Sequence, residues 1–358
     1  MGNITIKNYV ISGGGANDIT IDFSVDNSTP DLYETINFTS VSPDVITNYY
    51  WEFGDGTIST LANPSKSYTS IGFFNVQLTV SNSSSECGVV IKNNFIEVND
   101  LPYNAQTNLI IASIYANGGF VTPVRRVLMN QLVEDLLGIG TTGATNVYAD
   151  LAQLRIFAAE EIVSAKTDWV LAYALTNVVN GVSFIADRGF DTTGTTSING
   201  YLNNFFNPST NGIVLVNNMF IGYYFNRQVS TGLFTGCNDG TNFVGGVLDS
   251  VGTTFTRFNS LAAPTATAAF TNTGFIGLYR NNALSINRIL NGVLSAPILL
   301  NSSAKPNASV ITFGVGTTSG VVSTGHNSRC AVFVAGRVTD TLQLYNSLFN
   351  YLLAIGAS

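Results

Sequence analysis

Two pairs of neighbouring carboxylates are the residues best suited by type to acid–base chemistry: Glu134 with Asp135, and Glu160 with Glu161. Hydrolysis of a glycosidic bond needs two carboxyl groups across a cleft, one protonated and one ionised. In a strand, Glu160 and Glu161 would point to opposite faces, because successive side chains alternate. Glu134 and Asp135 fall on the polar side of an expected helix. The sequence therefore predicts no catalytic residues and a protein that is not an enzyme.

The histidine and cysteine content restricts nucleophilic and metal chemistry. His326 is the one histidine, in the sequence GHNSRC, and no acidic residue close in sequence would orient its ring. A serine nucleophile needs such an oriented base, and a zinc site needs several ligands. Cys87, Cys237 and Cys330 are far apart and lack a CxxC spacing. We therefore expect buried cysteines, no metal site and no cofactor.

Two short segments offer acidic side chains to a cation. Asp187 and Asp191 in ADRGFDTTG are candidates for a calcium site, although calcium prefers a denser acidic loop. The alternative, which we favour, is that Asp187 and Arg188 fix a tight turn. The sequence Asn-Asp-Gly at 238–240 likewise favours a turn over a ligand set.

Aromatic side chains are the other candidates for ligand binding. The chain has 23 Phe and 15 Tyr, most densely at residues 219–225 (MFIGYYF). Exposed rings beside Asn and Asp would suit stacking on sugars. Alternation along a strand instead predicts that half of the rings face a core and half a second surface, such as a subunit interface. We favour the core or interface, and the ligand-binding residues stay unknown.

The composition excludes a nucleic-acid partner. Only 10% of the 358 residues are charged, against about 25% in average domains. The 15 Lys and Arg and 22 Asp and Glu give a net charge of −7, and no stretch concentrates basic residues. A phosphate backbone needs clustered cations. Hydrophobic types reach 45%, and so many apolar residues with so few charges favour a homo-oligomer.

The N-terminal sequence, MGNITIKNYVISGGG, lacks the basic and apolar regions of a signal peptide. No run of about 18 apolar residues is present to insert into a membrane. With the first methionine taken as the native start, we expect a protein made in a cytoplasm and not exported by the usual route. Residues 1–18 form a separate segment, which is a candidate attachment strand for the sheet edge of a neighbouring protein.

Residues 19–100 carry the pattern of an antiparallel β-sandwich. ITIDFSV and ETINFTSV alternate apolar and polar residues, and Asp55-Gly56 is a hairpin-type turn signal. A set of residues in a characteristic order accompanies these strands: Trp51, Phe53, Gly54, Asp55, Gly56, Tyr68 and Gly72. On these residues the segment resembles the PKD domain family, an immunoglobulin-like β-sandwich. The resemblance implies buried Trp51 and Phe53, a structural Asp55, and a role in display and spacing.

Residues 101–121 are predicted to form a linker, and 122–358 to combine helices with short strands. Thr122 and Pro123 open a helix that ends at Gly138, and LRIFAA is a predicted strand. Asn291-Gly292 is the strongest hairpin signal. A last helix is capped by Thr339 or Thr341. The apolar faces of the two helices are Val124, Val127, Leu128, Leu132 and Leu136, and Leu342, Tyr345, Leu348, Phe349 and Leu352.

Several sequences in residues 120–358 carry a second resemblance, among them LRIFAAEEIVSAKTDW, FIADRGF, FNPS and GLYRNNALSINRILNGVL. Their order resembles a concanavalin A-like (laminin-G-like) module of phage tail, fibre and capsid-associated proteins. Such modules sometimes bind calcium, and glycosidases among them use a Glu-x-Asp-x-x-Glu strand, which this sequence lacks. The predicted fold is mainly β: a small Ig-like (PKD) sandwich and a larger concanavalin A-like jelly-roll sandwich with a few accessory helices.

These observations predict a bacteriophage virion structural protein, assembled in the host cytoplasm and bound to capsid or tail proteins. We expect its Ig-like and lectin-like domains to contact host or environmental glycans. One alternative is an exported bacterial adhesin or carbohydrate-binding protein whose leader has been removed. Another is a polysaccharide depolymerase, which the missing acid pair disfavours.

Overall fold

The computed structural model divides the chain into unit 1 (Met1–Pro102) and unit 2 (Tyr103–Ser358). The structure describes residues 9–10, 19–140, 143–174, 179–180, 182–191, 201–228, 233–239, 241, 243–248, 256–260, 273–308, 310–312, 314–317, 320–323, 328–337 and 340–357. His326, Thr339 and Gly240 lie outside these ranges.

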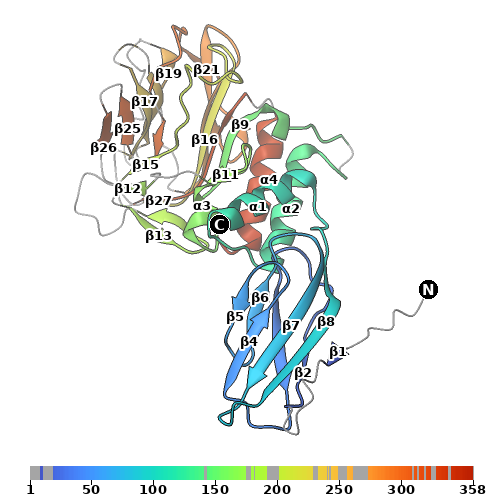
Figure 1. The fold of residues 1–358 in the computed structure, drawn as a ribbon. Helices are drawn as coiled ribbons and strands as arrows, with labels where there is room; N and C mark the ends of the chain where they lie inside the picture. Colours follow the sequence, from blue (N-terminus) through green and yellow to red (C-terminus); the bar gives the residue numbers. More distant parts are fainter. Residues whose placement is uncertain are drawn as a thin grey trace. The chain divides into compact units, whose positions relative to one another are not determined.

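Unit 1 is a β-sandwich of two sheets (Figure 1). Its strands are β1 (Tyr9–Val10), β2 (Asp22–Val25), β3 (Thr35–Val41), β4 (Asn48–Glu52), β5 (Ile58–Ser59), β6 (Ser65–Ser67), β7 (Gly72–Ser81) and β8 (Cys87–Val98). One sheet has the order β1-β8-β7-β4-β5 and the other β2-β3-β6, and neighbouring strands are antiparallel.

Alternating apolar residues build the core between these two sheets. In β3, Ile36 and Phe38 are buried while the residues on either side of each are exposed, as a period of two requires. Burial of this face is the main favourable contribution to folding. The predicted sandwich over 19–100 is confirmed.

The N-terminal segment reaches the edge of the same unit. Tyr9 pairs with Ile91 and Val10 with Val90, so β1 lies antiparallel to the outer edge of β8. The chain thus adds a strand to its own sheet here. The attachment of residues 1–18 to a neighbouring protein stays a prediction.

Unit 2 is a larger β-sandwich with helices beside it (Figure 1). A nine-stranded sheet runs β13-β14-β27-β16-β20-β21-β22, with β9 and β23 pairing to β27 and β21; a five-stranded sheet runs β19-β18-β17-β25-β26. Only β17 and β25 pair in parallel among the described strands. The strands are β9 (Leu151–Ile156), β10 (Thr167–Asp168), β11 (Tyr173–Ala174), β12 (Val179–Asn180), β13 (Ser183–Ile185), β14 (Gly189–Asp191), β15 (Tyr201–Asn203), β16 (Met219–Gln228), β17 (Leu233–Asn238), β18 (Phe243–Leu248), β19 (Thr256–Ser260), β20 (Gly274–Arg280), β21 (Ser285–Leu290), β22 (Val293–Leu294), β23 (Ile298–Leu299), β24 (Ile311–Thr312), β25 (Gly314–Thr317), β26 (Gly320–Ser323) and β27 (Ser328–Gly336).

The centre of the nine-stranded sheet is buried on both faces. Every residue of β9 and β20 is buried. Tyr223 and Phe225 of β16 face the core shared with Phe333, whereas Phe220 packs against Phe275 on the other face. Phe275 in turn contacts Tyr345 of the last helix. The aromatic cluster at 219–225 is therefore core, and its rings are not available to a sugar.

The hairpin predicted at Asn291-Gly292 is confirmed. These two residues connect β21 to β22 with Leu290 opposite Val293, and their φ angles are 48° and 81°. Both values are positive, as a two-residue turn of this hand requires. The Asn291 side chain also accepts a hydrogen bond from the Phe275 amide at 2.9 Å.

The described residues of unit 2 form four α-helices, α1 (Ala105–Ala116), α2 (Pro123–Leu137), α3 (Ile162–Lys166) and α4 (Thr341–Ala354), and a 3₁₀ turn at Tyr148–Asp150. The predicted start and end of α2 are confirmed, with Thr122 as N-cap and Gly138 as a left-handed C-cap. The cap of α4 was predicted wrongly, because Asp340 accepts the Gln343 amide in place of a threonine. LRIFAA is a strand only as far as Ile156.

The segment 101–121 was predicted as a linker, but most of it is α1. Asn104 caps this helix by accepting the Gln106 amide, and Ile110, Ile111 and Ile114 are fully buried. The division between the two units falls at Pro102. An apolar face at helical spacing thus makes this segment part of unit 2.

The buried face of α2 also differs from the predicted one. Val124 and Val127 are 74% and 56% exposed, whereas Arg125 and Arg126 are buried. Both arginines find partners: Arg126 donates to the Val121 carbonyl at 3.1 Å and Arg125 pairs with Asp187. Charges that are paired or hydrogen-bonded can therefore be buried here in place of valines, although Nη1 of Arg125 has no hydrogen-bond partner among the described residues.

Candidate functional site

The aromatic residues singled out in unit 1 lie at the centre of its core. Trp51 and Phe53 are 0% and 2% exposed, and their rings are stacked with centroids 6.2 Å apart. The Trp51 indole donates to the Leu61 carbonyl at 2.9 Å, and the Tyr68 hydroxyl donates to the Phe53 carbonyl at 3.1 Å. The polar atoms of these buried rings are thereby satisfied.

The turn that follows β4 is built on glycine and one carboxylate. Gly54 and Gly56 have φ angles of 82° and 83°, and a Cβ at Gly54 would lie 2.5 Å from the Asn75 carbonyl oxygen. Gly72 also has a positive φ. Asp55 accepts hydrogen bonds from the Thr57 amide and hydroxyl, and its carboxylate pairs with Lys66 at 2.5 Å. Asp55 therefore organises the turn.

We expect unit 1 to lose stability in acid through Asp55. Burial raises the pKa of this carboxyl, but the bonds from Lys66 and Thr57 outweigh burial, so the pKa lies below its ordinary value of 3.8. A lowered pKa stabilises the fold above 3.8, and this stabilisation is lost as the pH falls through the folded-state value. Urea denaturation at neutral and acidic pH should show that Asp55→Asn loses less free energy of unfolding in acid than the wild type. Equal losses in the two proteins would contradict this role of Asp55.

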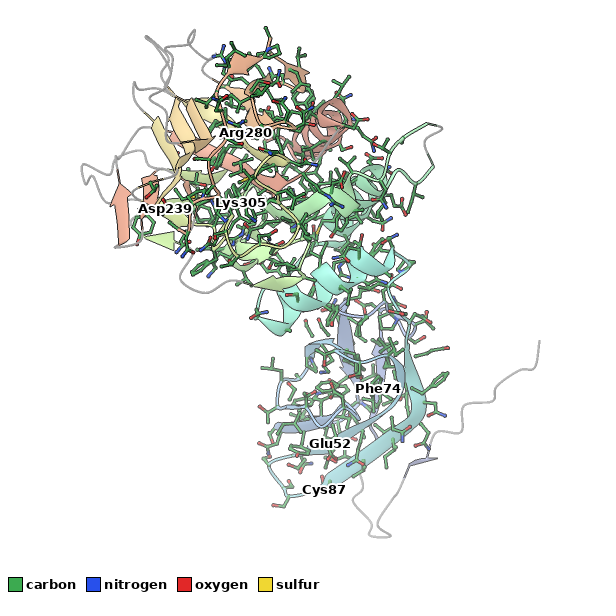
Figure 2. The ribbon with its side chains drawn as sticks, turned by 90° about the horizontal axis from the view of Figure 1, so that it is seen from above. Glu52, Phe74, Cys87, Asp239, Arg280 and Lys305 are labelled. Carbon is green, nitrogen blue, oxygen red and sulfur yellow. The ribbon has the colours of Figure 1, made fainter. Side chains whose placement is uncertain are left out.

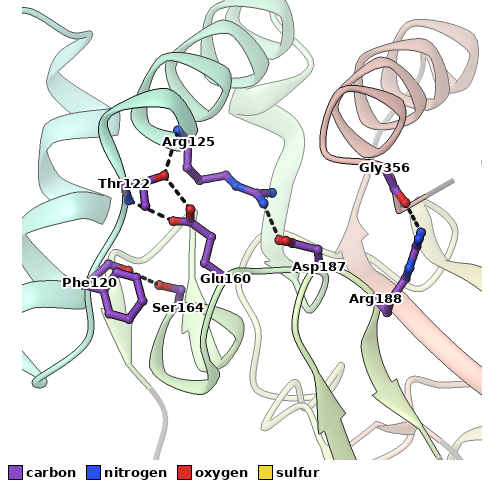
Figure 3. Close-up of polar contacts among 8 residues, drawn as sticks. All are labelled: Phe120, Thr122, Arg125, Glu160, Ser164, Asp187, Arg188 and Gly356. Atoms are coloured by element: carbon purple, nitrogen blue, oxygen red, sulfur yellow. Dashed lines mark hydrogen bonds and ion pairs between the residues drawn. The ribbon is translucent and has the colours of Figure 1, made fainter.

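A second polar cluster joins α2 to the hairpin β13–β14 in unit 2 (Figure 3). The Arg125 guanidinium pairs with the Asp187 carboxylate, and Arg188 donates to the Gly356 carbonyl. Burial opposes the charge of Arg125, but Tyr351 and Asp187 outweigh burial and raise its pKa. Burial raises the pKa of the Tyr351 phenol to about 12, so the phenol is neutral at pH 7 and becomes charged only in the alkaline range in which Arg125 titrates. The cluster fastens the hairpin to two helices.

Glu160 and Glu161, one of the two carboxylate pairs considered for acid–base chemistry, are occupied at helix starts. Glu160 accepts the Thr122 amide and hydroxyl (Figure 3), and Glu161 accepts the Val163 and Ser164 amides. The cavity beside Glu160 and Arg125 has a volume of about 10 Å³, enough for one water at most. These residues therefore hold α2 and α3 and line no substrate-sized cavity.

The two aspartates considered for a calcium site each pair with a different arginine. Asp187 lies in a turn with φ of 57° and pairs with Arg125. Asp191 is 2% exposed and accepts two bonds from Arg329, at 2.9 and 2.7 Å. Asp239 (Figure 2) accepts the Thr241 and Asn307 amides. Among the described residues, no group of three or more His, Cys, Asp or Glu could hold a metal ion.

The cysteines were predicted to be buried, and this holds for two of them. Cys237 and Cys330 are buried, whereas Cys87 is exposed at the start of β8 (Figure 2). Burial raises the pKa of the Cys330 thiol above its ordinary value.

In the part of the chain that the structure describes, no helix has the length and apolarity to cross a membrane.

An open groove of ligand size lies between α2 and α4. It has a volume of about 440 Å³, within the usual range for small-molecule sites. The two helices pack together, although their sequences are far apart. The groove is lined by Asp135, Gly143, Ala144, Asp340, Leu342, Gln343, Asn346, Ser347 and Asn350. No motif or spacing in the sequence indicated this groove.

Comparison with known proteins identifies unit 1. Residues 20–95 match the sequence model of the PKD domain. Unit 1 is a PKD domain. The PKD1 domain of Vibrio anguillarum Epp is similar, with 25% sequence identity, a match that covers 23% of this chain and 99% of that domain, and a TM-score of 0.20. No curated protein matches the sequence.

Two further solved structures are similar to the chain at low identity. A mutant of Trypanosoma rangeli sialidase with trans-sialidase activity is 10% identical, covers 89% of this chain and 49% of its own, and has a TM-score of 0.45. The chain thus spans about half the length of that sialidase. The binding domain of botulinum neurotoxin serotype D is 12% identical, and the match covers 56% of this chain and 53% of that domain, with a TM-score of 0.41.

The sialidase match corrects one prediction from the sequence. The chain was predicted not to be an enzyme, and the presence of sialidases among the similar structures contradicts that prediction. A similarity at 10% identity with a TM-score of 0.45 assigns no activity to this chain. The comparisons establish the family of unit 1, and the structure itself shows the mainly β fold of both units.

Proposed function

We propose that the chain is a surface attachment protein in which the PKD domain is a spacer and unit 2 contacts glycans. The observation that carries the proposal is a PKD domain followed by a separate, larger β-sandwich unit. A charge-poor surface suits this role. Amide and hydroxyl side chains can donate and accept hydrogen bonds with sugar hydroxyls, and only 10% of residues carry charge.

The finer proposal is that the chain is a surface component of a bacteriophage particle. In this proposal unit 2 is a concanavalin A-like module, and capsid or tail proteins are the partners. The order of sequence motifs in residues 120–358, which resembles phage tail and fibre modules, supports it. An exported adhesin is the competing assignment. The oligomeric state that goes with either is a homo-oligomer, favoured by the 45% hydrophobic content.

Two experiments test these proposals separately. The full chain should bind isolated bacterial envelopes, and periodate oxidation of vicinal diols in the envelopes should abolish binding, whereas protease treatment should not. Binding that survives periodate would contradict a glycan contact.

Immunogold labelling with antibody to residues 101–358 should decorate particle heads or tails regularly. Label confined to bacterial envelopes would contradict the virion assignment and favour the adhesin.

A further inference from the structure

We infer that the groove between α2 and α4 binds an uncharged saccharide. The inference rests on the proposed function, in which unit 2 contacts glycans, and it adds the site and the sugar class. The groove volume of about 440 Å³ accommodates a mono- or disaccharide, given that sites for small molecules start at roughly 300 Å³.

Two amides on α4 offer unused hydrogen-bonding groups to the groove. Asn346 and Asn350 line it, both are exposed, and they lie one helical turn apart on the same face. Within the described residues neither side chain is engaged in a hydrogen bond. Each amide carries two donors and an acceptor, so the pair can hold adjacent hydroxyls of one ring.

On the α2 side of the groove, Asp135 supplies a hydrogen-bond acceptor. Asp135 of α2 accepts a bond from Gln131 at 2.8 Å through Oδ1, and its Oδ2 is left for a ligand hydroxyl. Gln343 is fully used: it donates to the Asp135 and Thr145 carbonyls at 2.9 and 2.8 Å and accepts the Thr145 amide at 2.9 Å. Gln343 therefore ties α4 to α2 and to Thr145, which leaves Asn346, Asn350 and Asp135 to recognise a ligand.

The charge of the lining selects against acidic sugars. Asp135 and Asp340 are both in the lining, and none of the described lining residues is Lys or Arg. A sialic or uronic acid would bring its carboxylate towards two like charges with no cation to neutralise it, which is unfavourable. Leu342, 53% exposed, offers an apolar edge to the C–H face of a ring. A neutral hexose or N-acetylhexosamine fits this set.

Saturation-transfer NMR and calorimetry with the full chain test the site. The probes are neutral oligosaccharides of galactose, glucose and N-acetylglucosamine, with 3′-sialyllactose as the acidic probe. Neutral probes should bind, and sialyllactose should bind at least tenfold more weakly. Asn346→Ala and Asn350→Ala should each weaken neutral binding about tenfold, the loss of roughly one good hydrogen bond. Both side chains are exposed, so thermal unfolding should not change.

A matched variant and a charge variant complete the design. Asn93→Ala removes an exposed amide from β8 of the PKD domain and should leave binding unchanged. Asp135→Asn removes one of the two carboxylates from the lining and should therefore reduce the preference for neutral probes over 3′-sialyllactose. Neutral binding that is untouched by both α4 variants, or a preference for the acidic probe, would overturn the groove site while leaving the glycan attachment intact. Failure of every neutral probe would also overturn the site, and periodate-resistant envelope binding would overturn the proposed function itself.

Discussion

Trp51→Ala is expected to lower the free energy of unfolding of the PKD domain by about 3–5 kcal/mol, as for other fully buried aromatic residues. Trp51 is 0% exposed and contacts Phe23 and Phe38 at centroid distances of 5.1 and 5.5 Å. Truncation leaves a cavity among these rings and removes the donor to the Leu61 carbonyl. A domain of this size has a free energy of unfolding of roughly 4–12 kcal/mol, so the loss caused by Trp51→Ala is a large part of the stability of the domain.

Native-state hydrogen exchange of the full chain measures this loss, because it reports the two units separately. Amides of β7 and β4 should lose most of their protection in Trp51→Ala, while amides of β16 and β27 in unit 2 keep theirs. Tyr50→Ala is the matched control, since Tyr50 is the neighbouring residue of β4 and is 41% exposed. It should cost less than about 1 kcal/mol. Equal losses for the two variants would contradict Trp51 as the centre of the core.

Local signals in the sequence were sufficient for much of the fold. Alternating residues predicted the strands of unit 1, and Asn291-Gly292 and Thr122 marked a turn and a helix start that the structure confirms. A signal for α1 was also present, because Asn104 is a good cap and Ile110, Ile111 and Ile114 recur at helical spacing. The continuous apolar run MFIGYYF likewise indicates a strand buried on both faces.

The remaining features depend on residues that only the fold brings together. The buried face of α2 is set by Asp187, which pairs with Arg125 from a hairpin far along the chain. The groove needs Asp135 of α2 beside Asn346 and Asn350 of α4. Neither Asn has a neighbour in sequence that indicates a site, so pattern and spacing could not predict it. The PKD motif was accessible because its residues are close in sequence and their backbone requirements are local.

Arg329→Ala is expected to cost unit 2 about 3–5 kcal/mol, the usual effect of breaking a buried ion pair. The Asp191 side chain is 3% exposed and that of Arg329 19%, and the two residues lie opposite each other on β14 and β27. Removing the guanidinium leaves a carboxylate that is buried among strands and has lost both bonds from Arg329. Asp191→Ala combined with Arg329→Ala should be less destabilised than the sum of the two single variants, because each removes the other's penalty.

Arg337→Ala is the control for Arg329→Ala, because it breaks an arginine–aspartate pair just past the end of the same strand. Arg337 and Asp150 are 3.1 Å apart with side chains 46% and 26% exposed, and an exposed pair contributes at most about 1 kcal/mol. Urea denaturation at low and high salt separates the two cases. The Arg337 effect should be small and vanish in high salt, since exposed charges are screened, while the Arg329 effect persists. Equal, salt-sensitive losses at both positions would mean that Asp191 is solvated, and its carboxylate would then again be a candidate for a cation.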